Sequence, residues 1–91
     1  MTFEWDARKA DTNFLKHGVR FPETEPVFQD EYAITITDEG SDPGEQRFVS
    51  IGAGALGRIL VIVYCYRGTA IGIISARLAN RGEVHFYEVG R

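Results

Sequence analysis

Near its N-terminus, the chain repeats apolar positions with the spacing of a helix. We expect this helix over residues 7–17, with Asp6 as its N-cap and Gly18 as the residue that ends it. Three positions share one of its faces: Ala10, Phe14 and His17. Phe3 to Trp5 alternates and suits a short edge strand, and a second short helix is expected around Pro22–Phe28.

From residue 32 the apolar period becomes two, which is typical of strands. Residues 38–45 read as a loop, and Gly68-Thr69 reads as a tight turn. Residues 59–67 are almost continuously apolar, which favours a central strand covered on both faces. The expected strands are 32–37, 46–53, 59–67 and 70–77.

A C-terminal helix follows, because Asn80 and Glu83 have the spacing of a capping box. The sequence therefore predicts one α+β domain over residues 1–91. It would comprise N-terminal helices, an antiparallel sheet of about four strands, and the C-terminal helix.

Composition and charge narrow the class of protein. The 44% hydrophobic content is globular, and the single cysteine, Cys65, excludes an internal disulfide. No signal peptide or membrane-spanning run is recognisable, so we expect a cytoplasmic location and no membrane partner.

The net charge of −3 hides an uneven distribution. Residues 1–45 hold four basic and eleven acidic residues, for a net charge of −7, whereas residues 46–91 hold six arginines and two glutamates, for +4. Such a split hints at a polyanionic partner, unless the two halves interleave in space.

Short motifs along nearly the whole chain resemble the BrnT toxin family. They are Phe3-Glu4-Trp5-Asp6, Lys9, Asn13, Lys16-His17-Gly18-Val19, Phe21, Val27-Phe28, Asp30, Gly44-Glu45, Arg47, Ile51-Gly52, Gly57-Arg58, Leu60, Val63-Tyr64, Arg67, Ile73-Ile74-Ser75-Ala76-Arg77, Ala79, Glu83 and Tyr87-Glu88. The resemblance implies a RelE-like ribonuclease toxin fold. It also implies an RNA substrate and a BrnA-like ribbon-helix-helix antitoxin, whose complex with the toxin would bind operator DNA. A homodimer within that complex stays open.

Two departures from the family pattern remove positive charge. Gly72 stands where the family often has a basic side chain, and Gly82 with residues 84–86 replaces a more basic segment.

A metal-independent ribonuclease uses the 2′-hydroxyl of the RNA as its nucleophile. The protein then needs cations to stabilise charge at phosphorus and groups that move a proton. Arg47, Arg67 and Arg77 end apolar strands and are candidate phosphate clamps, and Arg58 is a candidate RNA contact. A simple hairpin would pair Arg67 with Ala70 and Arg77 with Leu60, more than about 20 Å apart, unless a bulge intervenes.

His17 is the candidate proton-transfer group, because imidazole titrates near neutrality, but it suits the end of a helix equally well. Lys16 beside it is a candidate RNA contact. Tyr87 is a candidate proton donor or a half-buried packing residue. We expect Glu45 to support Arg47 by an ion pair, and Glu83 to serve the capping box rather than as a base.

No metal site and no cofactor are expected. One cysteine and two distant histidines give no ligand cluster, and the GxGxxG spacing at residues 52–57 opens no helix. The alternative to a ribonuclease toxin is a catalytically silent toxin-fold module that acts as antitoxin partner and corepressor. A nucleic-acid-binding domain without enzymatic activity is a third reading.

Overall fold

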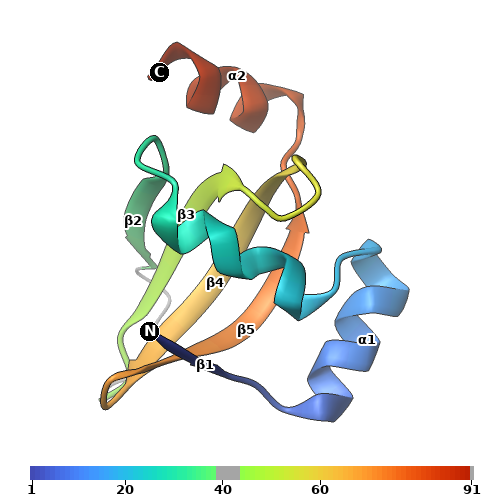
Figure 1. The fold of residues 1–91 in the computed structure, drawn as a ribbon, viewed down its shortest axis with the longest axis vertical. Helices are drawn as coiled ribbons and strands as arrows, with labels where there is room; N and C mark the ends of the chain where they lie inside the picture. Colours follow the sequence, from blue (N-terminus) through green and yellow to red (C-terminus); the bar gives the residue numbers. More distant parts are fainter. Residues whose placement is uncertain (39–43, 91) are drawn as a thin grey trace.

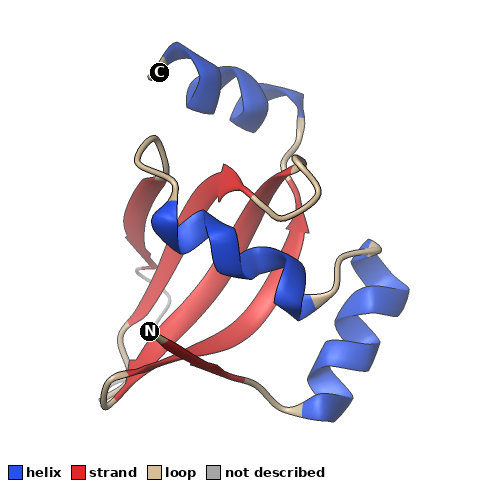
Figure 2. Cartoon of the chain, viewed as in Figure 1, coloured by secondary structure: helices blue, strands red, loops and turns tan. Residues whose placement is uncertain are grey.

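A computed structural model of the chain describes residues 1–38 and 44–90, in which one sheet of five strands is flanked by three helices (Figures 1 and 2). The strand order is β1-β5-β4-β3-β2, with β1 parallel to β5 and the other neighbours antiparallel. The strands are β1 (Thr2–Glu4), β2 (Ile34–Asp38), β3 (Arg47–Ala53), β4 (Ile59–Arg67) and β5 (Ala70–Leu78).

The expected α+β class is confirmed, but the expected sheet of about four antiparallel strands is wrong. The sheet has five strands and is mixed, because the short edge strand expected at Phe3 to Trp5 joins it as β1. The position of β1 at an edge agrees with the expectation, but its parallel partner was not predicted. Its pairing with Ala70–Gly72 joins residues almost seventy positions apart, and local periodicity carries no signal for such a contact.

Helix α1 (Ala7–His17) has the predicted bounds and caps. The Asp6 carboxylate accepts hydrogen bonds from the backbone N–H of Arg8, at 2.8 Å, and of Lys9, at 3.1 Å. Gly18 ends the helix in the left-handed region, with φ of 69°.

The second helix, η1 (Phe21–Gln29), is a 3₁₀ helix that crosses one face of the sheet (Figure 2). Pro22 lies in its first turn and Pro26 inside it. A proline within a helix cannot donate to the preceding turn, which accounts for the irregular form. The predicted short helix is thus present and slightly longer than expected.

The hairpin of β4 and β5 contains a β-bulge. Val63 pairs with Ser75 and Tyr64 with Ile73, so Ile74 is the extra residue. Arg67 faces Ala70 as predicted, but the bulge shifts Arg77 from the expected Leu60 to Val61.

The core lies between the sheet and η1, with Phe21, Leu60 and Ile62 fully buried. The side chain of Asn13 joins α1 to β5, because its amide nitrogen donates to the carbonyl oxygens of Val19 (3.0 Å) and Ala76 (2.8 Å). Its amide oxygen accepts from the Ala76 N–H at 3.0 Å.

Helix α2 (Arg81–Val89) begins with the predicted capping box of Asn80 and Glu83. It sits beyond one end of the sheet (Figure 1). The predicted loop at residues 38–45 falls mostly on positions 39–43, which lie outside the described residues; Asp38 itself belongs to β2.

Candidate functional site

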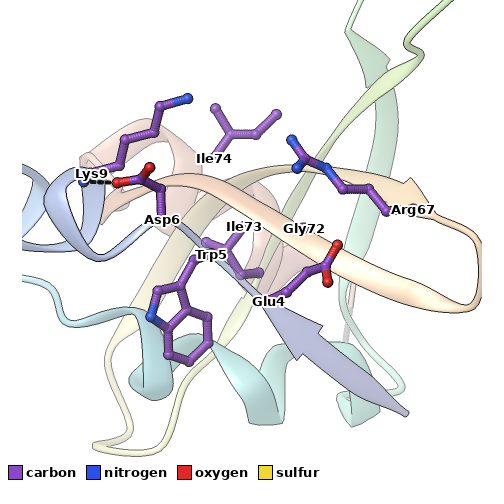
Figure 3. Close-up of a pocket in the computed structure, with 8 residues that line it drawn as sticks. All are labelled: Glu4, Trp5, Asp6, Lys9, Arg67, Gly72, Ile73 and Ile74. Carbon is purple, nitrogen blue, oxygen red and sulfur yellow. Dashed lines mark hydrogen bonds between the residues drawn. The ribbon is translucent and has the colours of Figure 1, made fainter.

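Two adjoining hollows lie along the side of the sheet where α1 meets β5. The first, here called the edge pocket, has a volume of about 400 Å³ and is lined by Glu4, Trp5, Asp6, Lys9, Arg67, Gly72, Ile73 and Ile74 (Figure 3). The second, the helix pocket, has a volume of about 290 Å³ and is lined by Arg8, Lys9, Thr12, Asn13, Lys16, His17, Ile74 and Ser75. They share Lys9 and Ile74, and we call them together the basic groove.

The groove follows from the local structure of β1 and β5. β1 pairs with β5 only as far as Gly72, while β5 continues to Leu78, so the edge of β5 is uncovered beyond that point. The bulge at Ile74 bends this edge, and α1 packs beside it. The two pockets fill the space between the helix and the bent strand.

The structure brings Lys16 and His17 into the helix pocket, beside Ser75 of β5. The last turn of α1 carries both residues, where cations are favoured by the helix dipole. His17 is partly exposed, so a ligand in the pocket can reach its ring. The groove also contains Arg8 and Lys9, to which the sequence analysis gave no role.

Arg77 lies two residues beyond Ser75 on β5, which places both on the same face of the strand, about 7 Å apart. Its guanidinium donates two hydrogen bonds to the Glu83 carboxylate, at 2.7 and 2.8 Å. The Arg77 bonds are the main reason that the pKa of Glu83 falls to about 2, with a smaller contribution from the Asn80 N–H. Glu83 in turn raises the pKa of Arg77. The Glu83 carboxylate, which caps α2, therefore also orients the Arg77 guanidinium.

Arg67 lies at the opposite end of the hairpin, in the edge pocket. Arg77 lies seven positions beyond Ala70, the partner of Arg67, which is roughly 23 Å along a strand. The bulge does not bring the two arginines together, so a clamp of Arg47, Arg67 and Arg77 around one phosphate is not formed.

Arg47 pairs across the sheet with Cys65 and forms an ion pair with Asp38, with 3.6 Å between Nε and Oδ2. The structure thus shows Asp38, rather than the expected Glu45, as an ionic partner of Arg47. The charge of Glu45 acts on Arg67, whose pKa it helps to raise after the larger effect of a hydrogen bond with Cys65.

The contacts of Arg58 stabilise the fold rather than form part of the groove. Its guanidinium donates to both carboxylate oxygens of Glu23, at 2.6 and 2.7 Å, and to the carbonyl oxygen of Gly18 at 3.0 Å. Glu23 is almost fully buried, and its hydrogen bonds raise the pKa of Arg58. This arrangement joins η1 to the end of β3 and β4 and does not favour the predicted role of Arg58 in RNA binding.

Tyr87 is 3% exposed and lies away from the basic groove. Its hydroxyl donates to Oδ2 of Asp30 at 2.6 Å, and the same oxygen accepts from the Ala53 N–H at 2.9 Å. The packing alternative for Tyr87 agrees with this geometry better than a catalytic role does. In the sequence, Asp30 stands out only as part of a family motif, and nothing local indicates its contact with Tyr87, which is 57 positions away.

Comparison with known proteins gives the chain a family. The family model described as "Ribonuclease toxin, BrnT, of type II toxin-antitoxin system" matches residues 5–83. The chain belongs to the BrnT toxin family. It is also similar to the crystal structure of the Brucella abortus ribonuclease toxin BrnT, with 26% sequence identity and a TM-score of 0.73. The match covers 89% of this chain and 99% of that one. A search of curated proteins gave no match.

Membership in the BrnT family confirms the resemblance drawn from the sequence motifs. The family is one of ribonuclease toxins in type II toxin–antitoxin systems, so this toxin has an antitoxin partner. Within residues 1–38 and 44–90, no three histidine, cysteine or carboxylate side chains gather as a metal site would require. None of the described helices is long and apolar enough to cross a membrane.

Proposed function

We propose that this BrnT-family toxin is an endoribonuclease that cleaves RNA in its basic groove without a metal ion. The observation that carries the proposal is the set of cations that line the groove, Arg8, Lys9 and Lys16 from α1 and Arg67 from β4, next to the imidazole of His17. Cationic side chains attract phosphates and repel a divalent metal, so they suit a reaction in which the protein alone stabilises the charge at phosphorus.

The reaction needs a base, an acid and stabilising cations. The 2′-oxygen attacks the adjacent phosphorus as His17 accepts its proton, and the bond from phosphorus to the 5′-oxygen breaks as that oxygen takes up a proton from a water molecule. Lys16 and Arg77 stabilise the developing negative charge, with Glu83 as the positioning residue for Arg77. The products are a 2′,3′-cyclic phosphate and a 5′-hydroxyl. Arg67 contacts RNA further along the groove.

The antitoxin in this proposal is a BrnA-like ribbon-helix-helix protein that also carries the complex to operator DNA, in the cytoplasm. Large apolar side chains are exposed outside the groove and would be available to such a partner: Ile36 is 58% exposed, Phe86 59% and Val89 68%.

The test is cleavage of single-stranded RNA by the purified protein in excess EDTA. We expect cuts that leave cyclic phosphate or 3′-phosphate ends. His17→Gln should abolish them with little change in the midpoint of thermal unfolding. Cleavage that appears only with an added divalent metal would overturn the mechanism.

One observation favours the alternative of a silent module. Arg77, 43% exposed, is already engaged by Glu83, so part of its charge is compensated before RNA binds. On that reading the protein would bind its antitoxin and support repression but cut no RNA in any buffer, which the same assay would reveal.

A further inference from the structure

The edge pocket differs from the helix pocket because it carries both signs of charge. Lys9 and Arg67 are its cations and Glu4 and Asp6 its carboxylates, and Ile74 adds apolar surface on the side of Lys9 and Arg67 (Figure 3). The Trp5 ring also borders the pocket but packs against Phe21 on the other face. Asp6 is occupied, since its carboxylate caps α1. A cavity that offers donors, an acceptor and apolar surface suits a nucleobase better than a bare phosphate.

Arg67 reaches this pocket because residue 72 is glycine. A Cβ atom at Gly72 would lie 3.1 Å from Nε of Arg67 and 3.2 Å from Sγ of Cys65, which is closer than ordinary contact. The aliphatic part of the Arg67 side chain therefore lies across the backbone of β5 at Gly72, and its Nε occupies the space next to a Cβ position there.

Glu4 flanks Gly72 on its other side. β1 is parallel to β5 and Glu4 is the registered neighbour of Gly72, so the Glu4 side chain shares the sheet face on which Arg67 lies. Figure 3 shows the Glu4 carboxylate and the Arg67 guanidinium on either side of Gly72. The pocket thus presents a planar pair of donors and a pair of acceptors.

Guanine is the base whose edges match both groups. It offers the adjacent acceptors O6 and N7 to an arginine and the adjacent donors N1–H and N2–H to a carboxylate. Adenine lacks O6 and N1–H, and the pyrimidines lack N7. We propose that the edge pocket binds one unstacked guanine base of a single-stranded RNA, read by Arg67 and Glu4. This subsite rests on the proposed function, since it assumes that RNA occupies the groove.

The path of the RNA follows from the shared residues of the two pockets. Lys9 lines both, so the phosphate attached to the bound guanosine can contact Lys9, and the chain then continues toward Lys16 and His17. The guanine subsite would place the cleaved bond within a nucleotide or two of a guanosine.

The fluorescence of Trp5 tests the subsite directly, because Trp5 lines the edge pocket and is the single tryptophan of the sequence. The probes are the 2′-O-methyl pentanucleotides UUGUU and UUAUU, which cannot be cleaved through a 2′-hydroxyl. We expect UUGUU to bind roughly tenfold more tightly than UUAUU, since one bidentate base contact discriminates by about that factor. Equal affinities within twofold would overturn the assignment to guanine.

Three variants test whether Arg67 and Glu4 are the side chains that recognise the guanine base. Glu4→Gln and Arg67→Lys should each reduce the preference for UUGUU to about twofold or less. Gly72→Ala should do the same although both reading groups remain, because its Cβ displaces Arg67. Combining Gly72→Ala with Arg67→Lys should cause no further loss. A preference that survives all three variants would contradict the proposal.

Two control variants make the same substitutions at sites outside the pocket. Arg81→Lys makes the same substitution at an exposed site on α2, and Gly82→Ala adds a Cβ whose nearest neighbour lies at 3.5 Å. Both should retain the tenfold preference. Binding needs no cleavage, so a protein that prefers UUGUU but cuts no RNA would refute the proposed function alone. Cleavage without the preference would refute the guanine subsite alone.

Discussion

Arg77 combines two roles at the level of a single side chain. Its two hydrogen bonds to Glu83 fix the guanidinium at the start of α2, while its position on β5 keeps it near the helix pocket. A cation that is already oriented loses little freedom when charge develops on a substrate, and such preorganisation is the main source of electrostatic catalysis. The ion pair is therefore compatible with function, although it also stabilises the fold.

We expect Arg77→Lys to lower the rate of RNA cleavage on the order of a hundredfold. Lysine keeps the charge but cannot make both bonds to Glu83 and also face the RNA. The variant should remain folded and still bind its antitoxin. Rate measurements on purified protein decide the matter, with Arg81→Lys as the control. If Arg77→Lys and Arg77→Ala both cleave RNA as fast as the parent, the role of Arg77 is structural.

The pKa of Glu83 predicts a loss of stability in acid. Because its pKa is lowered from 4.5 to about 2 in the folded state, its ion pair stabilises the protein above pH 4.5. That contribution is lost as the pH falls toward 2. Solvent exposure of the pair reduces it to about 1–2 kcal/mol. Urea unfolding should find Glu83→Gln less stable by this amount at pH 7 and nearly equal to the parent near pH 2. A difference independent of pH would contradict the assignment.

At the level of elements, two polar contacts between described residues attach α2 to the rest of the molecule at different points. The Tyr87 hydroxyl bonds to Asp30 at one point, and Glu83 bonds to Arg77 at the other. Asp30 also accepts from the N–H groups of Tyr32 and Ala53, so its carboxylate joins the end of η1, the end of β3 and α2. This carboxylate organises the end of the sheet opposite the edge pocket.

Tyr87→Phe removes the hydroxyl and keeps the buried ring. We expect a loss of about 1–2 kcal/mol in the free energy of unfolding, since the lost bond is to a charged acceptor. Amide hydrogen exchange should increase in α2, while RNA cleavage is unchanged. The opposite result, normal stability with lost cleavage, would restore Tyr87 to the catalytic residues.

Local signals in the sequence located most elements of this fold. Asp6 and Gly18 bound α1, Asn80 starts α2, and the apolar run of β4 has the predicted limits of residues 59–67. Each of these caps and apolar runs acts through residues within a few positions of it in the sequence. The helix and strand limits that they set can therefore be predicted without knowing the rest of the structure.

The parts of the structure that the sequence did not reveal depend on distant contacts. The parallel pairing of Glu4 with Gly72 and the bulge at Ile74 together create the edge pocket, and no local pattern indicates either of them. The groove as a whole also depends on contacts between distant segments. Lys16 and His17 were expected as separate candidates, but Lys9 became relevant only once α1 was placed beside β5.

At the scale of the whole molecule, the two oppositely charged halves of the sequence do interleave. The basic groove takes Arg8, Lys9 and Lys16 from the acidic half and Arg67 from the basic half. The molecule measures 33 × 27 × 24 Å, whereas charges are screened over about 8 Å at physiological ionic strength. The local charge of the groove, rather than the net charge of −3, therefore governs the attraction of RNA.

This difference between local and net charge predicts how two single substitutions act on RNA binding. Lys16→Ala removes one phosphate contact, so the slope of log K against log salt concentration for UUGUU should become shallower by about 0.7. Glu88→Gln, on the exposed face of α2 outside the groove, makes the net charge less negative but should leave the slope unchanged. Fluorescence titrations of Trp5 between 50 and 200 mM salt measure both. If Glu88→Gln strengthens binding as much as Lys16→Ala weakens it, net charge controls the association and the groove is not the RNA-binding surface.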